Sequence, residues 1–183
     1  MVACDDGRVR KGAQFTVLAC LLWNAGPQRA RFSLVRIDGL EASSIVAALA
    51  LQLGRGEALL LDSLTSAGFN PISPSTVERV TGLPTVAVYT YEPSSERLRA
   101  AMEKHLLDWE LRLRVLKEVD KAQRTLTARG ELYVYAWGLS LGEAKSLVEG
   151  LQIHARVPEP LRLAHMLASD MSRLLSMSAG GGI

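Results

Sequence analysis

The first part of the chain alternates short apolar runs with polar turns. An apolar run over residues 2–4 ends at Asp5, and a longer run covers residues 14–23. A third run, over residues 30–37, ends at Asp38. Apolar runs of this length, separated by Gly, Asp, Asn and basic residues, predict three antiparallel strands at the start of the chain.

After these strands the pattern changes to helices that alternate with strands. Apolar residues at helical spacing, followed by a glycine, predict a helix over residues 40–53. The continuous apolar run over residues 58–61 is typical of a strand buried on both faces. A short helix beginning near Ser75 and a strand over residues 85–89 follow. This order predicts β-α-β connections.

The second half of the chain has mostly helical patterns. Apolar residues recur at steps of three or four over residues 94–122, which predicts a long amphipathic helix with a break near Leu107. Residues 131–137 predict one further strand, at an edge of the sheet. A capping box precedes a helix over residues 141–151, and a proline begins a last helix over residues 160–177.

Length and composition indicate one globular domain. The chain has 183 residues, of which 48% are hydrophobic and 22% charged, which excludes a disordered protein and suffices for one core. We expect this domain to cover residues 1–177 and to be followed by a flexible tail at 178–183. The net charge of +2 permits a nucleic-acid partner without requiring one.

The chain carries no feature of a membrane or exported protein. No apolar run reaches the roughly 18 residues that a membrane-spanning helix needs. Acidic residues stand near the start, where an export signal would be basic and then apolar. We therefore expect a cytoplasmic protein without a membrane partner. Cys4 and Cys20 lie in apolar runs, are too few for a zinc site, and are expected to be buried free thiols.

Carboxylates at the ends of apolar runs are the main chemical feature. Asp5, Asp38 and Asp62 each directly follow such a run, and in α/β sheets the functional crevice lies at strand ends. Crowded carboxylates repel one another unless a cation compensates, and oxygen ligands favour Mg²⁺ or Mn²⁺. Such sites hydrolyse phosphodiesters. Each aspartate alone is more typical of a turn than of a functional site, and only the joint pattern favours a site. Asp6 should point to the other face of its strand as a structural residue.

Several segments, in order along the chain, carry a resemblance to a known family. They are Cys4–Gly7, Ile37–Gly39, Leu61–Asn70, Gly82–Pro84, Asp108–Glu110 and Val157–His165. These segments resemble the archaeal endonuclease dU family, which is related to endonuclease V. The resemblance implies an RNase H-like α/β fold with a mixed sheet, in which three antiparallel strands precede β-α-β units and helices flank the sheet.

The resemblance also implies an activity and a set of site residues. It implies a metal-dependent endonuclease that cuts DNA containing deoxyuridine or another altered base, as in DNA repair, with Mg²⁺ or Mn²⁺ as cofactor. Asp5 and Asp62 would be the principal metal ligands, and His165 would lie near the scissile phosphate. The intermediate acidic ligand would be Asp38 or Glu41, with a slight preference for Asp38.

The loop after Asp62 is a candidate contact for the altered base. Gly68, Phe69 and Asn70 could stack on and hydrogen-bond an extruded base, although packing of Phe69 over the sheet is equally expected. This chain has Ser63 and Ser73 where the family usually has glycine and aspartate.

Alternative interpretations stay open. His165 could be a structural histidine on an apolar helix face. Basic residues over 94–122, including Arg112, alternate with glutamates, which favours a solvated helix face over phosphate contacts. The protein could also be a non-catalytic RNase H-like module that binds nucleic acid or protein, or a phosphatase or nucleotide hydrolase with the same metal site.

Overall fold

One large sheet forms the centre of the fold, and helices cover its two faces. The computed structural model describes residues 1–54 and 56–179. In this part of the chain the strands are β1 (Val2–Asp6), β2 (Phe15–Trp23), β3 (Pro27–Arg36), β4 (Leu59–Leu61), β5 (Thr65–Ser66), β6 (Asn70–Pro71), β7 (Thr85–Tyr89), β8 (Gln123–Thr127) and β9 (Gly130–Trp137). The helices are α1 (Ala42–Leu53), α2 (Pro74–Thr81), α3 (Ser95–Met102), α4 (Trp109–Leu116), the 3-10 helix η1 (Lys117–Lys121), α5 (Leu141–Leu151) and α6 (Glu159–Ala179).

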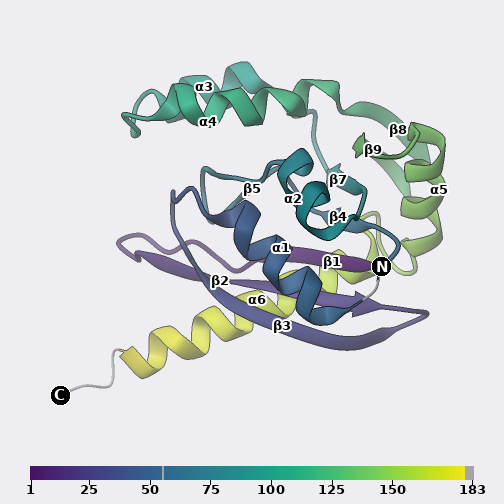
Figure 1. Ribbon diagram of the computed structural model, residues 1–183, viewed down its shortest axis with the longest axis horizontal. Helices are drawn as coiled ribbons and strands as arrows, with labels where there is room; N and C mark the ends of the chain where they lie inside the picture. Colours follow the sequence, from purple (N-terminus) through teal and green to yellow (C-terminus); the bar gives the residue numbers. More distant parts are fainter. Residues whose placement is uncertain (55, 180–183) are drawn as a thin grey trace.

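The sheet is mixed, and its strand order is β3-β2-β1-β4-β7-β9-β8 (Figure 1). The first three strands are antiparallel neighbours, whereas β4 runs parallel to β1, and β7 runs parallel to β4. Strands β5 and β6 pair separately as a short ribbon. The predicted succession of three antiparallel strands and then β-α-β connections is confirmed.

Successive side chains of the central strands point to opposite sides of the sheet. They are buried on both faces because helices cover both. Val2 and Cys4 belong to the core formed with α1, while Ala3 belongs to the core formed with α6. Leu60 likewise faces the second core, and its neighbours Leu59 and Leu61 face the first. In Figure 1, α1 and α2 lie on one side of the sheet and α6 on the other.

Two predicted elements differ from the structure. The long helix over residues 94–122 is divided into α3, α4 and η1, with the break before Asp108 that its pattern suggested. The strand over 131–137 is not at an edge, because β8 pairs with its outer side. β8 was missed because its buried residues are threonines, while its one aliphatic side chain, Leu126, is 72% exposed.

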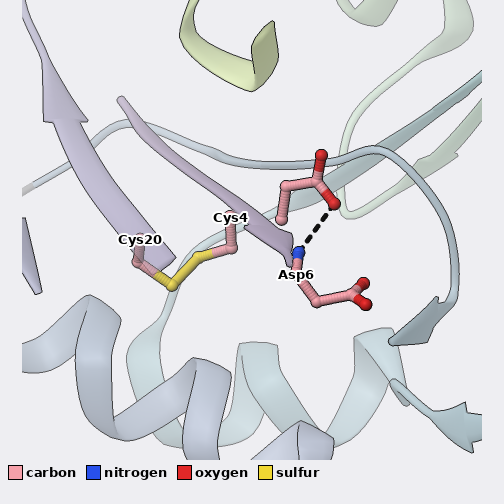
Figure 2. Close-up of a disulfide and its surroundings, with 4 residues drawn as sticks. Cys4, Asp6 and Cys20 are labelled. Carbon is pink, nitrogen blue, oxygen red and sulfur yellow. Dashed lines mark hydrogen bonds between the residues drawn. A yellow bond between two sulfur atoms is a disulfide. The ribbon is translucent and has the colours of Figure 1, made fainter. Parts of the chain in front are cut away.

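The cysteines correct a further expectation. Cys4 and Cys20 are joined in a disulfide and are not free thiols (Figure 2). The antiparallel register places these two residues directly opposite each other on β1 and β2, with Cα atoms 4.1 Å apart. Directly opposite side chains on one face are neighbours, which brings the two sulfurs within bonding reach.

The last helix extends slightly beyond its predicted end. α6 begins at Glu159, carries Pro160 in its first turn and continues to Ala179. The expected tail therefore overlaps the end of this helix, and its residues 180–183 lie outside the described residues. Among the described residues, none of the helices combines the length and the apolar character that crossing a bilayer requires.

Candidate active site

Three aspartates meet at one edge of the sheet. Asp5 and Asp6 end β1, and Asp62 follows β4, the parallel neighbour of β1. Because the register pairs Cys4 with Leu61, the next residues on the two strands are Asp5 and Asp62. One carboxylate oxygen from each of the three aspartates lies within 4.8 Å of the others. The sheet topology thus assembles an acidic cluster from residues far apart in the sequence.

Asp6 was not expected in this cluster. Neighbouring side chains in a strand leave on opposite faces, and on that ground Asp6 was interpreted as a structural residue. Since β1 ends at Asp6, both side chains can reach beyond the end of the strand, where no further backbone separates them. The backbone N–H of Asp6 also donates a hydrogen bond of 2.7 Å to Oδ1 of Asp5, drawn in Figure 2. This hydrogen bond holds the Asp5 side chain against the backbone of Asp6.

Burial and mutual repulsion make the cluster hold protons. Burial, together with the negative charge of Asp5, raises the pKa of Asp6 to about 6. Burial raises the pKa of Asp62 well above its ordinary value, and the charges of Asp5 and Asp6 raise it further. The three carboxylates are therefore not all ionised at neutral pH without a compensating cation.

His165 is the basic side chain that pairs with the acidic cluster. Its Nδ1 lies 3.1 Å from Oδ2 of Asp5 on β1. Its Nε2 lies 3.4 Å from the hydroxyl of Ser169, which is on α6 like His165 itself. The hydrogen bond to Asp5 raises the pKa of His165. The histidine side chain is half exposed. The structure thus places His165 in contact with Asp5, and His165 and Asp62 line one cavity.

A cavity of about 480 Å³ opens beside the cluster. It is bounded by the acidic residues, by the segment from Ser63 to Gly68, by the end of β7 and by the start of α6. Arg162 and His165 line its α6 side, and Tyr91 lines another. The side chain of Tyr91 is well exposed. This cavity offers a substrate direct access to the carboxylates.

Asp38 and Glu41 do not join the cluster. Oδ1 of Asp38 accepts a hydrogen bond of 2.8 Å from the backbone N–H of Phe69. The two oxygens of Glu41 accept hydrogen bonds from the backbone N–H groups of Arg36 and Leu40, at 2.7 and 2.9 Å. Both carboxylates therefore secure the turn between β3 and α1, and Asp6 is the third acid that the structure groups with Asp5 and Asp62.

The three residues expected to contact a base differ in their placement. Gly68 lines the cavity and has a φ of +84°, in the left-handed region that favours glycine. Phe69 packs against the core on the α1 face. Asn70 is fully buried, donates to the carbonyl of Arg36 and accepts from the N–H of Ala42. The structure therefore presents Gly68 to the cavity and places Asn70 inside the fold.

Arg112 was interpreted as part of a solvated helix face, but it is 4% exposed. Its Nη1 donates to the carbonyls of Gly39 and Phe69, at 2.6 and 2.9 Å, and its Nη2 donates to the carbonyl of Asp38, at 2.8 Å. Asp108 pairs with the same guanidinium at 2.8 and 2.9 Å. The planar fork of arginine thus joins two loops near the site. Spacing alone could not separate it from the exposed arginines of the same helix.

The donor set of the cluster fits a hard divalent cation. Three carboxylates within 4.8 Å supply oxygen ligands, and the group contains neither cysteine nor histidine. Oxygen-only sets suit Mg²⁺ and Mn²⁺ better than Zn²⁺. The raised pKa values of Asp6 and Asp62 indicate that positive charge is needed for full ionisation. Asp5, Asp6 and Asp62 are therefore suitable metal ligands.

Comparison with protein families and curated proteins gives consistent results. Residues 1–172 match the family model described as endonuclease dU. A UPF0215 protein of Aeropyrum pernix is 46% identical over 182 residues, which cover 95% of this chain and 98% of that protein.

Several solved structures have folds similar to that of this chain. A protein of unknown function from Archaeoglobus fulgidus superposes with a TM-score of 0.79 and 24% identity, covering 93% of this chain and 96% of that one. Human ENDOV gives a TM-score of 0.63 at 15% identity, covering 96% and 84% of the two chains. Endonuclease V of Ciona intestinalis, in complex with a 24mer DNA containing an inosine, gives 0.55 at 14% identity and covers 97% and 86%. These likenesses confirm the RNase H-like fold expected from the sequence.

Proposed function

The chain belongs to the endonuclease dU family, and on this basis we propose that it is a divalent-metal-dependent endonuclease that cuts DNA containing deoxyuridine or another altered base. The family and the likeness to endonuclease V support a nuclease. One observation carries the proposal: Asp5, Asp6 and Asp62 offer oxygens within 4.8 Å of one another, and His165 lies beside them.

Asp5, Asp6 and Asp62 would hold the cation. Asp6 would then be the third ligand, a role that we expected for Asp38 or Glu41. Mg²⁺ or Mn²⁺ bound there would compensate the negative charges and lower the pKa of a coordinated water molecule. Asp62 would bind the metal in its ionised form. Without a cation, burial and repulsion by the neighbouring carboxylates disfavour that form. Metal binding and loss of a proton from the cluster are therefore coupled.

His165 is suited to position and transfer protons at the scissile phosphate. Its Nδ1 is held by Asp5, so the orientation of the ring is set, and half of the side-chain surface stays exposed. In hydrolysis, the oxygen of water forms a bond to phosphorus and the water gives up one proton, while the bond to the leaving oxygen breaks and that oxygen takes up a proton. His165 would either orient the water molecule or protonate the leaving oxygen.

A DNA substrate with an altered base is supported by two observations. The Ciona intestinalis neighbour was solved with inosine-containing DNA. In this chain, the cavity of about 480 Å³ lies directly beside the acidic cluster and has Gly68 on its wall. A base extruded from a duplex could enter such a space while its phosphate stays near the carboxylates.

The direct test is cleavage of oligonucleotides that differ only in one uracil or thymine, as duplexes and as single strands, with Mg²⁺ or with EDTA. We expect cleavage of the uracil strand that requires the metal and disappears in Asp62→Asn. Glu96→Gln is the matched control, because it makes the same carboxylate-to-amide change on the exposed surface of α3. Cleavage by Asp62→Asn at the wild-type rate would rule out Asp62 as a metal ligand that the reaction requires.

Two other outcomes would identify the alternatives. DNA binding without cleavage of any substrate would indicate a non-catalytic binding module. Release of phosphate from nucleotides, assayed in parallel, together with intact oligonucleotides, would indicate a phosphatase or nucleotide hydrolase.

A further inference from the structure

A second cavity adjoins the acidic site along α6. It has a volume of about 290 Å³ and lies between α6 and the loop that follows β1. His165 and Met166 line both cavities, so the two are neighbours along one path. Three arginines line the second cavity: Arg8 and Arg10 from the loop, and Arg173 from α6. We call this cavity the arginine groove.

The walls of the arginine groove are fixed to each other. Ser172 of α6 accepts a hydrogen bond of 3.0 Å from the N–H of Val17, and its hydroxyl lies 3.0 Å from that of Thr16. Gly7, just before the loop, donates to the carbonyl of Val17 at 2.8 Å. A Cβ atom at Gly7 would collide with Oγ of Ser172 and with the backbone of Ala168. The glycine therefore permits the close contact that holds the loop against α6.

The groove carries positive charge that the protein neutralises only in part. Arg173 pairs with Asp170 at 2.6 Å, and Arg10 donates to the hydroxyl of Ser176 at 2.6 Å. In the described part of the chain, no carboxylate pairs with Arg8 or Arg10. The groove thus has an excess of guanidinium groups immediately beside a cluster of three aspartates.

The dimensions of the groove match a few nucleotides. From His165 to Arg173, α6 advances eight residues, or about 12 Å at the helical rise of 1.5 Å per residue. One strand of B-DNA rises about 3.4 Å per nucleotide, so this distance corresponds to about three nucleotides. Guanidinium groups bind phosphate oxygens through paired hydrogen bonds.

From these observations we propose that the arginine groove binds the phosphate backbone of the strand that is cut, on one side of the scissile phosphate. The inference rests on the proposed function, because it takes the acidic cluster as the place of cleavage. DNA is repelled by the carboxylates, and the arginines offset that repulsion while they fix the direction in which the strand crosses the site.

The test measures binding of a fluorescent uracil-containing duplex as a function of salt, with Mg²⁺ and in an Asp62→Asn background that prevents the proposed cleavage. For the triple variant Arg8→Ala, Arg10→Ala and Arg173→Ala, we expect at least tenfold weaker binding and a salt slope smaller by about 2 to 3, since each lost phosphate contact removes about 0.9. In the cleaving background, the same variant should show a higher KM and a kcat near that of the parent protein.

The matched control removes the same charge elsewhere, with Arg29→Ala, Arg79→Ala and Arg114→Ala, three exposed arginines that do not line the groove. Asp170→Asn provides a change of opposite sign: it frees Arg173, so binding should tighten by about two- to fivefold.

Equal losses in both triple variants, or unchanged binding in the groove variant, would overturn the proposal. Weaker binding of Asp170→Asn would also count against it. If the parent protein binds DNA through the groove but cuts nothing, the nuclease proposal fails, and only DNA binding by the groove is supported. If it cuts DNA while the groove variant binds normally, the reverse holds.

Discussion

Nδ1 of His165 lies 3.1 Å from Oδ2 of Asp5, which joins the last helix of the protein to its first strand at the acidic cluster. Asp5 uses its other oxygen to accept the N–H of Asp6. The aspartate is therefore held from two sides, and the imidazole is oriented by the same carboxylate. This pair connects the geometry of the site to its expected chemistry.

Replacement of His165 should affect catalysis more than binding. We expect His165→Ala to cut uracil-containing DNA about 10² to 10⁴ times more slowly, because a positioned proton-transfer group is lost. DNA affinity should stay within a few-fold of the wild-type value. Single-turnover kinetics and binding titrations measure the two quantities. Ser169→Ala, which removes only the 3.4 Å contact at Nε2, is the control and should retain nearly full activity.

Asp62→Asn should abolish cleavage and yet stabilise the metal-free protein. Burial and the neighbouring charges of Asp5 and Asp6 disfavour the ionised form of Asp62 in the folded state. An uncharged amide of similar shape avoids that cost, so we expect the free energy of unfolding in EDTA at pH 7 to rise. Urea titration measures it. A less stable variant would show that the carboxylate has a structural role instead.

The stability of the metal-free protein should depend on pH through Asp6. Its pKa is about 6 in the folded state, against an ordinary value of 3.8. Between these values the folded protein binds more protons than the unfolded chain, so the free energy of unfolding falls as the pH rises from about 4 to 6.

Thermal midpoints in EDTA at a series of pH values test this dependence. Asp6→Asn should make this fall shallower, with the remaining slope due to Asp62. Mg²⁺ should restore stability above pH 6, because a cation that binds only the folded protein stabilises it. A wild-type profile that rises over this range in EDTA would contradict the expectation.

Arg112 should be essential for stability despite its position on a helix rich in charged residues. Arg112→Lys keeps the positive charge but cannot serve three carbonyls and Asp108 together. We expect a loss of about 3 kcal/mol in the free energy of unfolding, measured with urea. Arg114→Lys, the same change at an exposed position of α4, should alter it by less than about 0.5 kcal/mol.

Reduction of the disulfide should weaken the strand pair that carries Asp5. Cys4 and Cys20 are separated by 16 residues, and a loop of this size corresponds to about 3 kcal/mol of stabilisation. We expect dithiothreitol to lower the unfolding midpoint of the wild type. A double variant, Cys4→Ala with Cys20→Ala, should already have the lower midpoint and should not respond to the reductant.

Much of the fold could be predicted from the sequence because its signals are local. The strand over 85–89 and the helix over 141–151 have the bounds expected from their apolar periodicity, and Ser140 forms the predicted capping box with Glu143. The same local signals failed for β8, whose buried positions are threonines. The sequence also singled out Asp5 and Asp62 by their positions at strand ends, and His165 by the resemblance of its segment to the family.

The tertiary structure decided which polar groups meet, since that depends on strand register and on the packing of distant elements. Parallel pairing of β1 and β4 brings Asp62 to Asp5 and Asp6, and the antiparallel register brings Cys20 to Cys4. Arg112 is buried because α4 lies against two loops, which its helical spacing could not indicate. Sequence thus determined the elements and the chemical types at their ends, whereas contacts between side chains far apart in the chain arose only when those elements were packed together.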